Sequence, residues 1–459
     1  MANNPNNPLA SSSEKKPSLL PGNDSQQQLR LTTLVPVSAP TGSRCKEDCY
    51  EEIRQVGEGM YGKVYKMREK RDPNDRNKPE VLVALKEVRM DNEKEGFPIT
   101  AIREIKLLAK FSEDREHRRR EGKRSSVSDD FVVKLKEIVT SKADHEKNDN
   151  KGGIYMVFEY MEHDLAGIRE NRACQFDLRM VKLVMWQILS GLHACHKNRI
   201  IHRDLKCSNV LMNNEGDVKL ADFGLARKMG DKKRMTPKVI TLWYRPPELL
   251  LGNQEYTEAV DMWSAGCIMA ELLLDKHFLP GNKESDQVEK IFAMFGYPTE
   301  RTWPGIFSGP VEDGKLDEKK FPLITSFPQE FTDRKGNKVL RSTKGEFEKK
   351  MKNPVNPFHK DMTEACMDLL RRLLAIDPSR RISAYEACQH AWFREAPDLG
   401  YYNSEMYQTT KRSLASQLRK VDESHEYEQR LKRKIERSER AQDQRAKMQR
   451  GLPQPRHFN

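Results

Sequence analysis

The spacing of hydrophobic residues divides the chain near residue 160. Before that point, short apolar runs at 81–85, 131–135 and 154–160 are bounded by glycine or charged residues, which is the pattern of β-strands. A single stretch, 99–110, instead repeats its apolar residues at the spacing of a helix. We therefore predict a small strand-rich region with one main helix.

Beyond this point the apolar pattern becomes helical. Long helices are predicted over 178–196 and 259–274, and shorter ones over 365–374 and 383–392. The stretch 310–360 is rich in Pro, Lys and Asp, which predicts irregular structure. Strands followed by helices in this order indicate an α+β fold in two lobes, with a cleft between them.

Both ends of the chain differ in composition from a packed domain. Residues 1–44 are rich in Asn, Ser, Gln and Pro, and we predict a disordered N-terminal arm over 1–49. Residues 394–459 are basic, and 411–450 contain almost no apolar stripe, so we predict a basic, partly helical or disordered tail. The charged stretch 113–130 is predicted to be an insertion.

The charge balance says little about nucleic acids. The formal net charge is +12, but half of the excess lies in the last 59 residues and is mainly a property of the tail. We therefore expect no direct sequence-specific nucleic-acid binding. We also expect no membrane contact and no secretion, because a long apolar run and a signal peptide are both missing. The eight cysteines form no C-x-x-C pair, which favours free thiols.

A glycine-rich string, G-E-G-M-Y-G-K-V at 57–64, lies between two predicted strands. Glycines let backbone N–H groups approach phosphate oxygens, because no Cβ stands in the way. By itself the string would equally suit an ordinary hairpin. It is not a dinucleotide-binding fingerprint, because a strand rather than a helix follows it.

Lys86 ends the apolar run V-A-L-K at 83–86. A lysine in this position is usually a solvated strand end. However, Glu104 follows eighteen residues later on the predicted helix. A helix packed on the sheet could bring this carboxylate to the ammonium group, and the pair could then hold the phosphates of a nucleotide.

Four further motifs follow in a fixed order. They are H-R-D-L-K-C-S-N at 202–209, D-F-G at 222–224, P-P-E at 246–248 and D-M-W-S-A-G at 261–266. After the glycine-rich string and the V-A-L-K run, this series resembles the eukaryotic protein kinases over residues 50–393. The resemblance implies the two-lobed protein kinase fold, with an N-lobe over 50–160 and a C-lobe over 161–393.

The resemblance also implies the catalytic roles. Asp204 would accept or orient the proton of the substrate hydroxyl, and Lys206 would neutralise the γ-phosphate as it transfers. Lys86 would hold the α- and β-phosphates of ATP, and Glu104 would hold Lys86. Phosphoryl transfer depends on such positioning and charge neutralisation more than on covalent help from the protein.

ATP and its metal ion are placed by the same resemblance. Asn209 and Asp222 would supply oxygen ligands to Mg²⁺. The stretch 154–165 is similar to the hinge between the kinase lobes, with Phe158 beside the adenine. The residues expected to bind ATP are Val56, Gly57, Glu58, Gly59, Met60, Tyr61, Gly62, Lys63, Val64, Ala84, Lys86, Phe158, Glu159, Met161 and Asp164.

The predicted main helix begins P-I-T-A-I-R-E at 98–104, which resembles the corresponding helix of cyclin-dependent kinases. The preceding segment 88–97, the segment 239–252 and Cys207 are similar to the transcription-linked members, including the twelve/thirteen and plant C-type enzymes. The resemblance implies a nuclear enzyme with a cyclin on the 98–104 helix face. Its implied substrates are Ser/Thr-Pro sites, above all the C-terminal repeat domain of RNA polymerase II.

Regulation and support of the fold are implied in the same way. Thr236 falls where these kinases carry an activating phosphothreonine, and its implied partners are Arg103, Arg203 and Arg227. Tyr61 is a possible site of inhibitory phosphorylation. Two carboxylates are implied to support the fold. Asp261 would accept hydrogen bonds from the backbone of residues 202–204, and Glu248 would pair with Arg381.

Two other hypotheses stay open at this point. A cell-cycle or other proline-directed Ser/Thr kinase would carry most of the same motifs. A catalytically inactive cyclin-binding scaffold would keep the fold without the chemistry. The scaffold is disfavoured because the residues that carry the chemistry are all intact, namely Lys86, Glu104, Asp204, Asn209 and Asp222.

Overall fold

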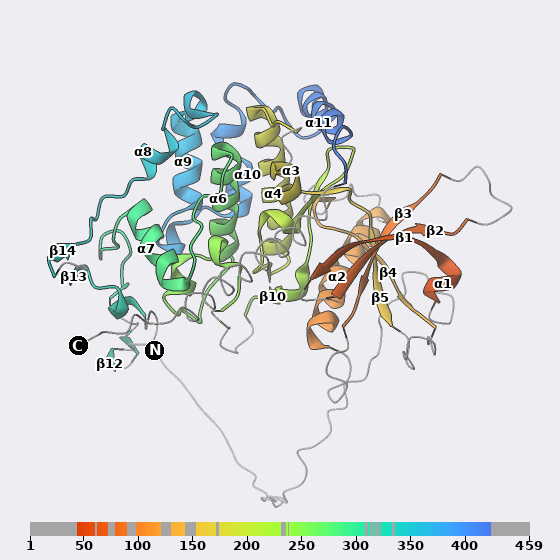
Figure 1. Ribbon diagram of the computed structural model, residues 1–459, viewed down its shortest axis with the longest axis horizontal. Coiled ribbons are helices and arrows are strands. Elements are labelled where there is room, and N and C mark those ends of the chain that lie inside the picture. The colour runs from red at the N-terminus through yellow and green to blue at the C-terminus, as the bar shows by residue number, and fades with distance from the viewer. Residues whose placement is uncertain are drawn as a thin grey trace, which may run out of the picture. The chain divides into compact units, whose positions relative to one another are not determined.

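The computed structural model places two groups of elements side by side, one rich in strands and one helical (Figure 1). None of the described helices combines the length and apolar character needed to cross a membrane. The structure describes residues 44–59, 62–71, 79–89, 98–120, 130–142, 153–170, 174–230, 236, 238–307, 311–312, 315–316, 321, 323–332 and 336–423.

The strand-rich lobe is a five-stranded antiparallel sheet with the order β1-β2-β3-β5-β4. Successive side chains of a strand point to opposite faces. In β5, Tyr155 and Val157 therefore pack with one apolar cluster, whereas Met156 and Phe158 pack with the cluster that contains α2. The strands are β1 (Tyr50–Gly59), β2 (Gly62–Glu69), β3 (Leu82–Glu87), β4 (Leu135–Thr140) and β5 (Ile154–Glu159).

The main helix, α2 (Ile99–Arg120), is ten residues longer than the prediction. Its first half buries Ile105, Leu108 and Phe111 against the sheet. Its second half is polar and runs into the stretch that we predicted to be an insertion. Glu, Arg and Lys favour a helix, and the sequence contains no Gly or Pro between Ile99 and Gly122 that would end it earlier.

The predicted boundary of the N-terminal arm at residue 49 was wrong by at least six residues. The four residues before β1 form a short helix, α1 (Lys46–Cys49), and Cys45 pairs with Thr140 of β4. The Nζ of Lys46 lies 4.8 Å from the ring centre of Tyr155. These contacts with the sheet, which composition cannot show, order the segment. Residues 1–43 of the predicted arm lie outside the described part of the chain.

The helical lobe is built around α6 (Ala259–Leu274), in which every residue is buried. α4 (Leu178–Lys197) packs against α6, and its first turn is capped by Asp177, which accepts a hydrogen bond from the backbone of Met180. The other helices are α3 (Leu165–Glu170), α5 (Pro247–Leu250), α7 (Glu284–Phe295), α8 (Phe347–Met351), α9 (Glu364–Leu373), α10 (Ala384–Cys388) and α11 (Glu405–Leu418).

Short strands and 3₁₀ turns connect these helices. The strands are β6 (His163–Asp164), β7 (Ile200–Ile201), β8 (Val210–Met212), β9 (Val218–Leu220), β10 (Arg227–Lys228), β11 (Val311–Glu312), β12 (Lys315–Leu316), β13 (Glu330–Thr332) and β14 (Lys338–Leu340). The β13–β14 hairpin and α8 lie in the stretch 310–360, which we had predicted to be irregular throughout. The helix predicted over 383–392 ends at Cys388 and is followed by a separate 3₁₀ turn.

The first part of the tail is packed against the C-lobe, which corrects the prediction that it has no apolar stripe. In α11, Tyr407, Leu414 and Leu418 are buried, and the helix contacts α4 (Figure 1). These residues are spaced at seven and four positions, which is one face of a helix. This apolar face begins before residue 411, so the window 411–450 contains only part of it. Residues 424–459 lie outside the described part of the chain.

A buried ion pair connects two segments of the C-lobe that are 133 positions apart in the sequence. Two nitrogens of Arg381 donate to the two carboxylate oxygens of Glu248 at 2.6 and 2.7 Å, and both side chains are almost fully buried. The guanidinium group also lies 5.1 Å from the ring centre of Trp263 on α6. The predicted pairing of Glu248 with Arg381 is therefore present, and it joins α5 to the segment that follows α9.

The first prediction concerns the stability that this pair provides. Glu248→Gln keeps the size of the side chain but leaves Arg381 as an unpaired buried charge. We expect the free energy of unfolding to fall by about 3–5 kcal/mol, as measured by urea unfolding of the full chain. Glu364→Gln, which removes an exposed partner of Arg371, is the control and should leave the midpoint nearly unchanged. Equal shifts in the two variants would contradict the structural role of the pair.

Candidate active site

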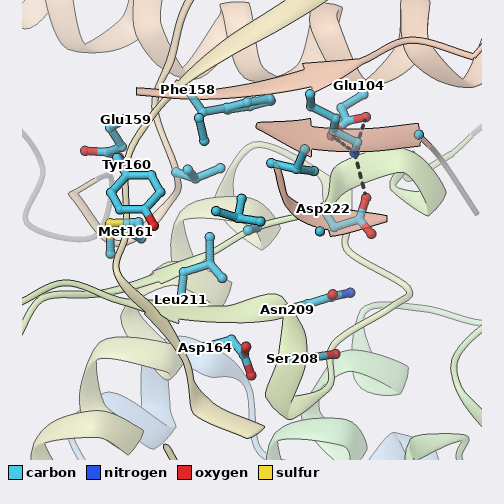
Figure 2. Close-up of a pocket in the computed structure, with 18 of the residues that line it drawn as sticks. Glu104, Phe158, Glu159, Tyr160, Met161, Asp164, Ser208, Asn209, Leu211 and Asp222 are labelled. Carbon is cyan, nitrogen blue, oxygen red and sulfur yellow. Dashed lines mark hydrogen bonds and ion pairs between the residues drawn. The ribbon is translucent and has the colours of Figure 1, made fainter. Parts of the chain in front are cut away.

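A cavity of about 230 Å³ lies between the sheet and the β8–β9 hairpin. Figure 2 shows its side chains converging from both lobes. The lining residues are Val56, Gly57, Glu58, Gly62, Val64, Ala84, Lys86, Glu104, Val133, Phe158, Glu159, Tyr160, Met161, Asp164, Ser208, Asn209, Leu211, Ala221 and Asp222. Most residues expected to bind a nucleotide therefore surround one space.

Lys86 stands at one end of the cavity between two carboxylates. Its Nζ donates to Glu104 at 2.9 Å and to Asp222 at 3.0 Å, as the dashed lines in Figure 2 show. Burial alone would lower the pKa of Lys86, but Asp222 and Glu104 raise it, so the ammonium group stays charged. The structure thus brings together a strand, the main helix and the D-F-G motif at one cation.

The two carboxylates of this group are not equivalent. Burial raises the pKa of Glu104 more than the charge of Lys86 lowers it. For Asp222, Lys86 outweighs the effect of burial, and the pKa is lowered. Asp222 therefore stays ionised while it faces the cavity. Its backbone is in the left-handed region, with φ 62°, and the next residue, Phe223, packs on His202 with ring centres 4.8 Å apart.

The loop with the H-R-D-L-K-C-S-N motif (residues 202–209), which we call the catalytic loop, is fixed by Asp261 from α6. Its carboxylate accepts hydrogen bonds from the backbone N–H groups of His202 and Arg203, both at 2.9 Å, as predicted. The φ of Arg203 is 64°, which costs energy for a residue with a Cβ. The buried carboxylate compensates for this strain and holds the loop whose Ser208 and Asn209 line the cavity. Asp204 does not belong to that lining, but it contacts Asn209.

Asp204 is surrounded by groups that could share its proton or charge. Its carboxylate accepts hydrogen bonds from Asn209 Nδ2 at 3.1 Å and from Thr241 Oγ1 at 3.2 Å, and it lies 3.9 Å from Nζ of Lys206. Burial raises the pKa of Asp204, and Lys206 opposes this effect. A buried carboxylate with a raised pKa is suited to accepting a proton.

Two oxygen-bearing side chains could hold a cation. The amide nitrogen of Asn209 donates to Asp204, so its amide oxygen is the atom left for a metal ion. The carboxylate of Asp222 lines the same cavity. Within the described ranges, no group of three or more His, Cys, Asp or Glu side chains is arranged to hold a metal ion. These two ligands would suit a cation that completes its coordination with phosphate and water.

The glycine-rich string spans the end of β1 and the start of β2. Gly62 has φ 133°, and a Cβ there would lie 2.1 Å from the carbonyl oxygen of Glu87, so only glycine fits. Gly59 ends β1, and Lys63 and Val64 follow Gly62 in β2. The predicted site residues Met60 and Tyr61 lie outside the described residues.

The hinge residue Glu159 uses its side chain to tie the lobes together. Its carboxylate accepts hydrogen bonds from Nζ of Lys219, at 2.7 Å, and from the backbone N–H of Lys134. In Figure 2 its oxygens point away from Asp222 and Asn209. This arrangement is compatible with adenine binding by the backbone groups of Glu159 and Met161, which the resemblance implies.

Five residues that line the cavity were not predicted from the sequence: Val133, Tyr160, Ser208, Leu211 and Ala221. Tyr160 and Ser208 lie within predicted motifs, Leu211 and Ala221 lie close to one, and Val133 lies in the predicted strand 131–135.

The expected regulatory residues come from three parts of the fold: α2, the H-R-D motif and the segment from the D-F-G motif to the P-P-E motif (residues 222–248), which we call the activation segment. Thr236 is exposed, and its backbone carbonyl accepts a hydrogen bond from Tyr256 Oη at 3.0 Å. Arg203 is buried, and Arg103 on α2 and Arg227 on β10 are half-buried. The structure thus leaves Thr236 accessible for modification, whereas the residues on either side of it, 231–235 and 237, lie outside the described part.

The last described residue of the tail, Glu423, contacts Tyr160, which lines the cavity. Its carboxylate accepts hydrogen bonds from Tyr160 at 2.7 Å and from Arg54 at 2.5 Å, and it pairs with Lys66 of β2. Burial alone would raise the pKa of Glu423, but these donors lower it to about 2. Sequence reasoning missed this contact because Tyr160 and Glu423 are 263 positions apart, and no local pattern links them.

Comparison with known proteins agrees with the geometry. The protein kinase domain family matches residues 50–393. The chain is 43% identical to Cyclin-dependent kinase C-1 of Arabidopsis thaliana over 81% of its own length and 64% of that protein. It is 42% identical to Cyclin-dependent kinase 12 of Drosophila melanogaster over 77% of its length, but over only 26% of that protein.

A solved structure is similar as well. It is the crystal structure of the yeast RNA Pol II CTD kinase CTDK-1 complex, with a TM-score of 0.59 and 37% identity over 79% of this chain and 98% of that one. The chain spans less than two thirds of the length of its first curated relatives. The family match nevertheless covers more than half of the chain, including the cavity and both lobes, and the chain therefore belongs to the protein kinase family.

Proposed function

We propose that this chain is a cyclin-dependent Ser/Thr protein kinase that uses ATP and Mg²⁺. The observation that carries the proposal is the shared position of Lys86 between Glu104 and Asp222, in the cavity that Asn209 also lines. A protein kinase of this family requires ATP and a divalent metal ion. Asp222 and Asn209 would hold Mg²⁺, and Lys86 would hold the α- and β-phosphates.

Asp204 and the residues around it would then direct the transfer. Asp204 would accept the proton of the substrate hydroxyl, and its raised pKa suits this role. Lys206, 3.9 Å away, would neutralise the charge of the moving phosphoryl group. Thr241 would hold the Asp204 carboxylate in place until the substrate arrives. ATP, when bound, supplies the phosphoryl group and leaves as ADP.

The cyclin partner is supported by an apolar surface on the main helix. Ile99 is 72% exposed and Ile102 is 37% exposed, both within the P-I-T-A-I-R-E segment of α2. Large exposed apolar side chains close together are typical of protein interaction sites. Glu104 follows Ile102 by two residues on the buried side of the same helix and binds Lys86, so a partner that shifts this helix would also shift the contact with Lys86.

The preference for proline after the phosphorylated residue is supported by the backbone of the activation segment. The carbonyl oxygens of Val239 and Ile240 both accept hydrogen bonds from Arg245, at 2.8 and 3.1 Å. Ile240 has φ 67°, a strained conformation that turns this backbone. With its acceptors occupied, the segment would disfavour a substrate residue whose N–H needs a partner, and proline has none.

The C-terminal repeat domain of RNA polymerase II is the proposed substrate. The support is the likeness to the yeast CTD kinase complex and to Cyclin-dependent kinase 12. A nuclear location follows from this substrate. The tail contains the basic run K-R-K at 432–434, which would suit a nuclear import signal and lies outside the described residues.

The second prediction tests catalysis. Asp204→Asn should lower the rate of phosphoryl transfer by at least about 10²-fold, because the amide cannot accept the substrate proton. Binding of ATP, followed by thermal shift, should persist. Asp368→Asn is the matched control on α9 and should keep full activity. Near-normal turnover of Asp204→Asn would contradict the assignment.

The third prediction tests the cyclin surface. Replacing Ile99 and Ile102 by Asp should abolish the recovery of cyclins with the tagged chain, as counted by mass spectrometry, because it places charge in an apolar interface. Leu340→Asp changes an equally exposed residue on β14 and should not affect recovery. A wild-type chain that captures no cyclin would overturn this part of the proposal.

The fourth prediction tests the substrate. Two heptad-repeat peptides that differ only in Pro or Ala after the acceptor serine should differ in kcat/KM by about 10-fold or more, the cost of one N–H left without a partner. A scrambled peptide that keeps the Ser-Pro pair separates recognition of the heptad from recognition of proline alone. Equal rates for the Pro and Ala peptides would rule out a proline-directed kinase.

A further inference from the structure

The hydroxyl group of Tyr256 connects the activation segment to the catalytic loop. Tyr256 Oη donates a hydrogen bond to the backbone carbonyl of Thr236 at 3.0 Å and accepts one from Nη1 of Arg203 at 2.9 Å. Both bonds have ordinary lengths, and the hydroxyl has one donor and one acceptor function in use. No other described residue is shown to bond both Thr236 and Arg203.

The ring of Tyr256 holds this hydroxyl in a fixed place. Its side chain is 95% buried in the C-lobe core, and the backbone immediately after it begins α6. Burying a hydroxyl group is unfavourable unless it is hydrogen-bonded, and phenylalanine would fill the same apolar space without that cost. Packing therefore explains the ring of Tyr256 but not its oxygen.

Arg203 is oriented by the same contact. Its backbone N–H is held by Asp261, its Nε donates to the carbonyl of Leu225 at 2.7 Å, and its Nη1 donates to Tyr256. Among the described residues, Nη2 has no protein partner. Arg227 is near enough for its charge to act on the Tyr256 hydroxyl, where both arginines oppose the rise in pKa that burial causes. An anion attached to Thr236 would meet positive charge here.

We propose that Tyr256 is a positioning residue that makes phosphorylation of Thr236 effective. It holds the Thr236 backbone at a fixed distance from Arg203, so that a phosphate on the threonine reaches a guanidinium group that is already oriented. This inference rests on the proposed role of Thr236 as the activating site. A phosphothreonine adds nearly two negative charges and three acceptor oxygens, which strengthens any fixed arginine contact.

The fifth prediction concerns the activation ratio, defined as kcat/KM of the Thr236-phosphorylated chain divided by that of the phosphatase-treated chain. Both forms are assayed as the full chain with its co-purified cyclin, on a heptad-repeat peptide. Tyr256→Phe removes one oxygen atom and both hydrogen bonds. We expect it to lower the activation ratio about tenfold, the effect of losing one hydrogen bond to a charged group. Removal of the phosphate by phosphatase should also become faster, because the phosphothreonine is held less firmly.

The matched control is Tyr297→Phe. Tyr297 is also buried, and its hydroxyl donates to the backbone carbonyl of Phe327 at 2.9 Å, away from the activation segment. Both variants lose a hydrogen bond to a carbonyl, and Tyr256→Phe also loses the one from Arg203, so the melting temperature should fall in both. Only Tyr256→Phe should change the activation ratio. A purely structural role would lower the activity of both phosphorylation states equally.

Thr236→Ala separates the two levels of the proposal. In this background, where no phosphate can be attached, Tyr256→Phe should leave kcat/KM unchanged within twofold, because the two residues act in one step. A wild-type ratio near one would refute the role of Thr236, and the role of Tyr256 with it. A high wild-type ratio that Tyr256→Phe leaves within twofold would refute the role of Tyr256 alone.

Discussion

The ion contacts of Lys86 are the interaction on which the active-site geometry depends. Its ammonium group forms ion pairs with two carboxylates, those of Glu104 from α2 and Asp222 from the D-F-G motif. Buried charges are costly unless they are paired, so the group is stable only when α2 lies close to the sheet. The carboxylates outnumber the cation, and Asp222 therefore keeps negative charge for a metal ion. Anything that moves α2 changes Lys86 and Asp222 together.

The C-lobe provides a rigid base by a related principle. α6 is buried on all sides, yet it carries Asp261 and Glu271, whose carboxylates bind other segments. Asp261 holds the backbone of the catalytic loop, while Glu271 accepts hydrogen bonds from Arg169 and Tyr244. Each buried acid is satisfied by several donors, which makes alternative positions of these loops unfavourable. The C-lobe side of the site is thus fixed by many buried contacts, whereas α2 is connected to the active-site residues through the pair of Glu104 and Lys86.

Long-range contacts connect this site to residues outside the predicted motifs, and one of these residues, Glu423, lies beyond the matched domain. Glu423 of the tail touches Tyr160 at the hinge, and Tyr256 joins Thr236 to the catalytic loop. The tail reaches the hinge because α11 is anchored on α4 and because Nζ of Lys411 pairs with Asp217 in the β8–β9 turn. What composition marked as a basic tail is, up to residue 423, part of the folded C-lobe.

The sequence by itself determined the two-lobed fold, the long helices and the residues around the cavity, because phosphate chemistry demands particular residue types at particular intervals. Gly62, Lys86 and Asp222 could be identified in this way. Only the tertiary structure decided that α2 continues to Arg120, that residues 44–49 belong to the N-lobe, and that Tyr160, Tyr256 and Glu423 join the site. Periodicity and composition report on neighbours along the chain. Contacts between residues far apart depend on how the packed elements meet, which no local pattern encodes.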